Sequence, residues 1–170
     1  TLFRSIVGSL LYLARGTRPD ISAAVGQLAR CMATPRAAHL SAAKRTLRTL
    51  RYIRGTMDVC LRYHRVPGHL NELIGYADAS YASCPDTSRS VSAYVFLFNG
   101  AAIAWQSRLQ TLVATSTAEA EYLAFAAATK EAMYLRNVLQ EIGLTQEEPT
   151  TVYEDNQPCI AIATNPMTCK

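Results

Sequence analysis

Three carboxylates in the second part of the chain have types and positions that could do chemistry. Asp78 ends an expected strand within Tyr76-Ala77-Asp78-Ala79-Ser80, where small neighbours let a ligand approach closely. Asp155 ends a later expected strand, and Glu121 lies in the first turns of a long expected helix. If the two strands are neighbours in one sheet and the helix packs across it, the three side chains meet in one pocket.

Such a pocket favours metal-ion chemistry. Three carboxylates close together repel one another unless cations neutralise them, and hard oxygen ligands select Mg²⁺ or Mn²⁺. Two such ions about 4 Å apart hold the attacking and leaving oxygens of a phosphodiester. The pattern therefore predicts a metal-dependent nuclease site in which Asp78, Glu121 and Asp155 bind two ions.

Two nearby glutamates are expected to have other roles. The run Ser116-Thr117-Ala118-Glu119 matches a capping box, so Glu119 has a structural reason to be present. Glu154 directly precedes Asp155 and, by strand alternation, is expected to point to the other face. Glu121 has no capping partner, and it would be interpreted as an ordinary solvated acid of a helix if the two aspartates were absent.

Charge is divided unevenly along the chain. Residues 1–70 hold twelve Arg and Lys against two Asp, a net charge of +10, whereas residues 71–170 carry −6. A helix expected in the first part has a basic flank. This basic flank is either a solvated surface or a contact for the sugar-phosphate backbone of a nucleic acid. Its members are Lys44, Arg45, Arg48, Arg51 and Arg54.

Residues 1–58 are expected to be helical. Apolar residues recur at three- and four-residue steps over 3–14, and a second helix is expected over 21–32. A third is expected over about 37–53. Its apolar stripe would be Leu40, Ala43, Leu47, Leu50 and Ile53.

The pattern then changes to short runs of β-branched and aromatic residues. Strands followed by a helix, a strand and a helix indicate an α+β domain preceded by a small helical one. The Asn99-Gly100 pair predicts a tight hairpin turn. The expected elements are strands over 59–64, 72–78, 91–98, 102–106 and 150–154, and helices over about 116–142 and 158–164.

Cysteine usage and hydropathy argue against a disulfide-stabilised or zinc-binding protein and against a membrane-spanning one. The five cysteines are scattered and odd in number, which argues against a disulfide framework or a zinc site and favours a reducing, intracellular setting. The longest apolar run, Ser5 to Ala14, is far shorter than the roughly 20 residues that cross a bilayer. Because the chain begins at Thr1, we expect it to be part of a longer polyprotein.

Several motifs, in their order and spacing, resemble the RNase H domain of copia-type long-terminal-repeat retrotransposon polyproteins. These are Ile74-Gly75-Tyr76-Ala77-Asp78-Ala79, Ser90-Val91-Ser92-Ala93-Tyr94-Val95-Phe96, Ala104-Trp105-Gln106-Ser107, Ser116-Thr117-Ala118-Glu119-Ala120-Glu121-Tyr122 and Asp155-Asn156-Gln157. Upstream strings resemble the end of the reverse transcriptase in the same polyproteins. They are Phe3-Arg4-Ser5-Ile6-Val7-Gly8-Ser9-Leu10-Leu11-Tyr12-Leu13-Ala14, Thr17-Arg18-Pro19-Asp20-Ile21, and the segment from His39-Leu40 to Arg54-Gly55-Thr56.

The resemblance implies a ribonuclease that cuts the RNA strand of an RNA/DNA hybrid with two Mg²⁺ or Mn²⁺ ions. Asp78, Glu121 and Asp155 fall on the family's three leading metal ligands. The implied fold is an RNase H-like mixed β-sheet with flanking helices over 59–170, preceded by a reverse-transcriptase segment over 1–58. The family continues past this point with a last strand and helix, so we expect the sheet domain to be truncated before them.

The implied partners are the hybrid and the remainder of the polyprotein, with no membrane. The implied location is intracellular, either cytoplasmic in a virus-like particle or nuclear. Two other interpretations stay open: a catalytically inactive nucleic-acid-binding remnant of such an element, and a host protein that reuses the fold for protein contacts.

Overall fold

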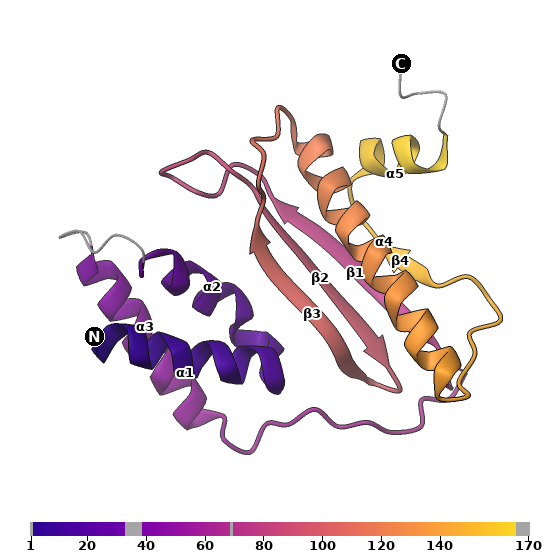
Figure 1. Cartoon of the computed structure of the whole chain (residues 1–170), viewed down its shortest axis with the longest axis horizontal. Coiled ribbons are helices and arrows are strands. Elements are labelled where there is room, and N and C mark those ends of the chain that lie inside the picture. Colours follow the sequence, from indigo (N-terminus) through magenta and orange to yellow (C-terminus); the bar gives the residue numbers. More distant parts are fainter. Residues whose placement is uncertain (1, 33–38, 69, 166–170) are drawn as a thin grey trace. The chain divides into compact units, whose positions relative to one another are not determined.

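The chain forms two compact units, Thr1–Arg62 and Tyr63–Lys170, in the computed structural model (Figure 1). The structure describes residues 2–32, 39–68 and 70–165, with the backbone alone for 39–43. The division that the sequence placed at residue 58, and the identity of each part as a domain, stay predictions.

Helices make up the first unit, as expected. They are α1 (Leu2–Gly16), a short 3₁₀ helix (Pro19–Ile21), α2 (Ser22–Arg30) and α3 (His39–Gly55). Val7 and Leu10 of α1 pack with Val25 and Leu28 of α2, and each of the four is at most 2% exposed. The apolar residues that recur along the first two helices therefore form the core of this unit.

The third helix turns a different face to this core than the sequence predicted. Leu47 and Leu50 are 56% and 39% exposed, whereas Thr46 and Thr49 are each 6% exposed. Ile53 packs against the core as expected, seven and four residues after Thr46 and Thr49. The predicted stripe was wrong at 47 and 50 because the helical period tells which residues share a face but not which face meets a neighbour. The side chains of residues 40 and 43 lie outside the described ones.

A buried arginine links the turn before α2 to the end of α3. Arg18, 7% exposed, donates to both carboxylate oxygens of Asp20, the shortest contact being 2.7 Å from Nη2 to Oδ2. The same guanidinium donates to the carbonyl and hydroxyl oxygens of Thr56, at 3.1 and 2.6 Å, and lies 5.5 Å from the ring centre of Tyr52. The turn before α2 is thereby attached to the end of α3.

The second unit contains a mixed four-stranded sheet of order β3-β2-β1-β4. Its strands are β1 (Leu73–Ser80), β2 (Val91–Phe98), β3 (Ala101–Leu109) and β4 (Thr151–Tyr153). β1 pairs with β2, and β2 with β3, in antiparallel fashion, whereas β1 and β4 run parallel. Asn99 and Gly100 have φ angles of 49° and 81°, which confirms the tight hairpin turn.

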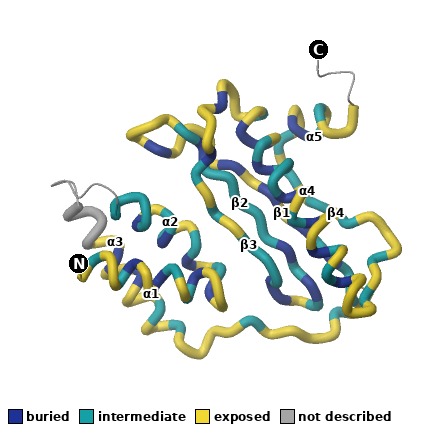
Figure 2. The backbone as a smooth tube through the Cα atoms, in the orientation of Figure 1, coloured by how far each residue is buried: buried dark blue, intermediate teal, exposed yellow. Residues whose placement is uncertain are grey.

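Two helices flank this sheet. The long helix α4 (Thr117–Glu141) lies across one face, and α5 (Gln157–Thr164) follows β4 (Figure 1). Buried residues follow one side of α4 at three- and four-residue steps, and the other side is exposed (Figure 2). They meet Leu73 and Phe96 of the sheet, which are 1% and 0% exposed. The expected α+β class with a mixed sheet and flanking helices is confirmed.

One expected strand does not form. Residues 59–64 have no strand partner and leave Val59 56% exposed. The end of this segment instead attaches to the β2–β3 hairpin, because the amide of His64 donates to the carbonyl of Asn99 at 2.9 Å and the hydroxyl of Tyr63 donates to that of Ala102 at 2.9 Å. A run with strand propensity becomes a strand only where a sheet edge receives it.

No helix within the described ranges is long and apolar enough to cross a membrane. None of the four described cysteines forms a disulfide bond with another described residue: Cys31, Cys60, Cys84 and Cys159.

The Arg18 network generates a prediction about the first unit. Arg18→Gln should destabilise that unit by about 2–4 kcal/mol, because it leaves Asp20 and the Thr56 carbonyl without their charged donor. Native-state hydrogen exchange should show faster exchange of α2 and α3 amides, with the amides of α4 unchanged. Arg15→Gln, at an exposed position of α1, is the matched control. Equal protection in both variants would contradict the role of this network.

Candidate metal centre

The parallel pairing of β1 and β4 brings the two aspartates together. Tyr76 of β1 is in register with Tyr153 of β4, and their rings stack with centroids 5.1 Å apart. Asp78 and Asp155 each lie two residues farther along the chain, so both lie toward the same end of this pair of parallel strands. The expectation that the strands bearing these residues are neighbours is confirmed.

Small residues let the first turns of α4 lie close to the end of β1. Ala79 of β1 packs with Ala120 and Ala124 of α4 and with Ala114 of the preceding loop, and all four are at most 7% exposed. Larger side chains at these positions would hold the helix away from the strand. This contact brings Glu121, the residue after Ala120, to the aspartates.

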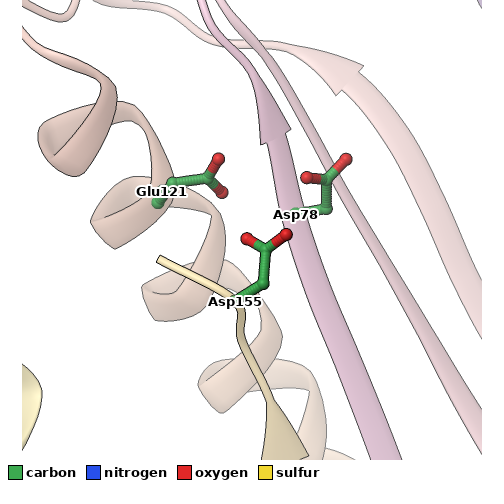
Figure 3. Close-up of side chains that lie close together, drawn as sticks. All are labelled: Asp78, Glu121 and Asp155. Carbon is green, nitrogen blue, oxygen red and sulfur yellow. The ribbon is translucent and has the colours of Figure 1, made fainter. Parts of the chain in front are cut away.

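The three predicted ligands form one cluster. One carboxylate oxygen each of Asp78, Glu121 and Asp155 lies within 4.8 Å of the others. Figure 3 shows the three carboxylates converging from β1, from α4 and from the segment after β4. The two aspartates are exposed, whereas Glu121 is only 8% exposed. The cluster is therefore open to solvent on the aspartate side and closed on the helix side.

Burial and like charges act together on Glu121. They raise the pKa of its carboxyl from 4.5 to about 7, with loss of hydration as the largest cause, followed by the charges of Glu154, Asp78 and Asp155. A hydrogen bond from the backbone of Ala79 opposes this rise of the pKa. The metal-free cluster is thus electrostatically unfavourable at neutral pH.

Glu154 acts on the cluster through its charge. This charge contributes to the raised pKa of Glu121, and the pKa of Glu154 is itself raised by burial and by Asp155 and Asp78. β4 ends at Tyr153, directly before Glu154, and the expected direction of this side chain stays a prediction. One oxygen accepts from the amide of Asn156 at 3.2 Å, and the group of three mutually close carboxylates does not include Glu154.

Glu119 has the structural role that its capping box predicted. The Ser116 hydroxyl accepts from the Glu119 amide at 3.1 Å. The Glu119 carboxylate accepts from the amide and hydroxyl of Thr115, at 2.6 and 2.7 Å, one residue before the expected reciprocal partner. These bonds lower the pKa of this carboxyl. Glu119 is therefore occupied at the helix start, outside the metal cluster.

The donor set fits a hard divalent cation. Glu121 Oε2 is buried and has no hydrogen-bond partner within the described chain, so its negative charge is not compensated there. Oxygen ligands from three carboxylates are the kind that Mg²⁺ and Mn²⁺ prefer. A cation bound to Asp78, Glu121 and Asp155 would remove both the repulsion and the unsatisfied oxygen.

The five bases of the basic flank all lie exposed on α3, in the first unit: Lys44, Arg45, Arg48, Arg51 and Arg54. Arg45, Arg48 and Tyr52 also line a cavity of about 460 Å³ against α2, where Gln27 and Asp20 complete the lining with apolar neighbours. Asp20 is neutralised there by its pairing with Arg18. The flank thus presents cations on a partly concave surface.

Comparison with known proteins finds similarity to segments of retrotransposon polyproteins. No family model matches the chain. The retrovirus-related Pol polyprotein from transposon TNT 1-94 of Nicotiana tabacum is 44% identical over 165 residues, which cover 97% of this chain and 12% of that polyprotein. The corresponding polyprotein from transposon RE1 of Arabidopsis thaliana is 36% identical over 98% of this chain and 11% of its own length. This chain is therefore similar over nearly its whole length to one segment of these retrotransposon Pol polyproteins.

Another relative has a different name and a comparable length. Secreted RxLR effector protein 161 of Plasmopara viticola is 40% identical over 133 residues, which cover 78% of this chain and 90% of that protein. This chain spans about an eighth or less of the two polyproteins but nearly all of this relative.

Charge repulsion in the cluster of Asp78, Glu121 and Asp155 generates a prediction about the stability of the second unit. In EDTA at pH 8, Glu121→Gln should stabilise the second unit by about 1–2 kcal/mol, because it removes a buried, uncompensated charge. A carboxyl whose pKa is raised in the folded state contributes stability below its unfolded pKa and loses it as pH rises. The gain should therefore grow between pH 4.5 and about 7, the interval of the shift.

Urea denaturation followed by Trp105 fluorescence, at pH 4.5 and pH 8, measures this gain. Glu141→Gln, at the exposed end of the same helix, is the matched control. A pH-independent effect, or an equal effect of the control, would contradict the electrostatic explanation.

Proposed function

We propose that this chain is the RNase H portion of a retrotransposon reverse transcriptase polyprotein, cleaving the RNA strand of an RNA/DNA hybrid. The observation that carries the proposal is the convergence of Asp78, Glu121 and Asp155, with their oxygens within 4.8 Å, on a mixed sheet crossed by one long helix. Similarity of the chain to a segment of retrotransposon Pol polyproteins supports it. The RNase H-like fold is part of the proposal.

The chain's own residues would divide the work as follows. Asp78 and Asp155 lie on the exposed side and would hold the ions where a phosphodiester can reach them. Glu121 would complete the site from the buried side, its orientation fixed by the Ala79 amide. Two bound Mg²⁺ or Mn²⁺ ions would supply an activated water and neutralise the charge that develops on the phosphate.

The basic flank would supply affinity that does not depend on sequence. Five exposed bases follow one another along α3, as expected of side chains that neutralise backbone phosphates: Lys44, Arg45, Arg48, Arg51 and Arg54. We further propose that residues 1–58 are the end of the reverse transcriptase, and that the remainder of the polyprotein is a partner. The proposed location is intracellular, in cytoplasmic virus-like particles or the nucleus.

A second candidate function comes from the Plasmopara relative. The chain matches 90% of that protein, which is named as a secreted effector and not as a polyprotein. In this alternative the fold serves protein contacts and the carboxylates bind no metal. A third candidate is an inactive remnant that retains only hybrid binding.

Cleavage of a labelled RNA strand in an RNA/DNA hybrid, with Mg²⁺ or Mn²⁺, tests the proposal. We expect the chain extended through its natural downstream residues to cleave, and Asp78→Asn to lower the rate by about 10²-fold or more while hybrid affinity is retained. Asp86→Asn, at an exposed loop position, should leave the rate unchanged.

The other outcomes separate the candidates. An extended chain that binds hybrid without cleaving it supports the inactive remnant. Calorimetry that detects no Mn²⁺ binding to the wild type, together with no hybrid binding, supports the protein-contact alternative.

Salt dependence of hybrid binding tests the basic flank. Arg48→Gln should lower the slope of log affinity against log salt by about 1, because one fewer phosphate is neutralised. Arg15→Gln, an exposed base outside the flank, should leave the slope unchanged. If the two variants have the same slope as the wild type, the flank is a solvated surface. Fluorescence anisotropy in EDTA measures the affinity without cleavage.

A further inference from the structure

A second cavity of the sheet unit, of about 340 Å³, lies between the β2–β3 strands and α4. Its volume lies within the range of small-molecule sites, about 300–1,000 Å³. We call it the α4–β3 cavity. It is lined by Ser92, Gln106, Arg108, Leu109, Gln110, Thr111, Leu112, Leu123, Ala127 and Lys130.

The α4–β3 cavity is separate from the metal centre. Leu123 and Lys130 follow Glu121 by two and nine positions, which places both about half a turn away around the helix, at roughly 100° per residue. None of the three carboxylates of the metal centre lines the cavity. A ligand in this cavity would therefore occupy the opposite flank of α4.

The charge of the cavity favours an anion. Arg108 and Lys130 are exposed, and neither forms an ion pair with any carboxylate in the described ranges. No acidic side chain is found among the described residues that line the cavity. The neighbouring Glu131 accepts a hydrogen bond from the Tyr94 hydroxyl at 3.1 Å and does not line the cavity.

A buried glutamine in the lining of the cavity has a carbonyl oxygen that lacks a hydrogen-bond donor. Gln110 is 8% exposed, and its amide nitrogen donates to Ser92 Oγ at 2.8 Å and to the Ala120 carbonyl at 2.9 Å. Because that carbonyl only accepts hydrogen bonds, the amide cannot be flipped. The remaining atom, Oε1, is buried without a partner in the described structure. A buried acceptor of this kind is unfavourable until something donates to it.

We propose that the α4–β3 cavity binds the phosphorylated ribose of a ribonucleotide. Arg108 and Lys130 would hold the phosphate, and a ribose hydroxyl would donate to Oε1 of Gln110. Leu112 and Leu123, which also line the cavity, would contact the apolar face of the sugar or base. The proposal goes beyond the nuclease function and does not depend on it. The phosphorylated ribose belongs either to a free nucleotide or to an RNA strand.

Calorimetry on the full chain in EDTA tests the proposal, because chelation keeps the metal centre out of the measurement. The probes are adenosine 5′-monophosphate, its 2′-deoxy form and a single-stranded RNA hexamer. We expect at least one ribose probe to bind, the 2′-deoxy form to bind about five-fold more weakly, and Arg108→Gln or Lys130→Gln to weaken binding about ten-fold. Arg65→Gln, an exposed base elsewhere in the same unit, should leave affinity unchanged.

Each outcome has one meaning. Binding of the mononucleotide alone assigns a free nucleotide, and binding of the hexamer alone assigns an RNA strand. Absence of binding by both ribose probes overturns the proposal, as does an equal loss in Arg65→Gln, which would show unspecific attraction. Equal affinity of the deoxy form overturns the assignment of ribose. Loss of hybrid cleavage in the earlier experiment leaves all these results intact.

Discussion

The contact between alanines at the end of β1 and the start of α4 is the constraint on which the rest of the site depends. Ala79, Ala114, Ala120 and Ala124 are at most 7% exposed, and their small size lets backbone approach backbone. Glu121 thereby reaches two aspartates that the parallel β1–β4 pair has already placed side by side. A bulkier residue in this contact would separate the carboxylates without touching any of them.

The short distances between the three carboxylates are electrostatically unfavourable without a cation. The pKa of Glu121 is raised to about 7, and one of its oxygens has no partner within the described chain. The apolar contacts of α4 with Leu73 and Phe96 lie farther along the helix and hold it on the sheet. Packing thus supports an arrangement of charges that would otherwise move apart, as is usual where a protein prepares a binding site.

Helix α4 also lies between two sites of opposite charge in the second unit. One flank carries the acidic cluster, which suits cations, and the other contributes Lys130 to a cavity that suits an anion. The basic side chains of the first unit occupy two kinds of environment. Arg18 is buried and fully paired, whereas the five bases of α3 are exposed. Burial with a partner makes an arginine structural, and exposure leaves a base available for a ligand.

The sequence by itself determined the α+β class, the hairpin turn and the cap of α4, because capping, turn chemistry and periodicity act over a few residues. Its motifs also named the three carboxylates, whose convergence depends on the β1–β4 pairing and on the packing of α4. Only the tertiary structure decided which face of α3 is buried, that residues 59–64 form no strand, and that Glu154 lies near the cluster. It also showed the Arg18 network and the α4–β3 cavity. These features depend on contacts between residues far apart in the chain. Local patterns state which residues share a face but not what that face meets.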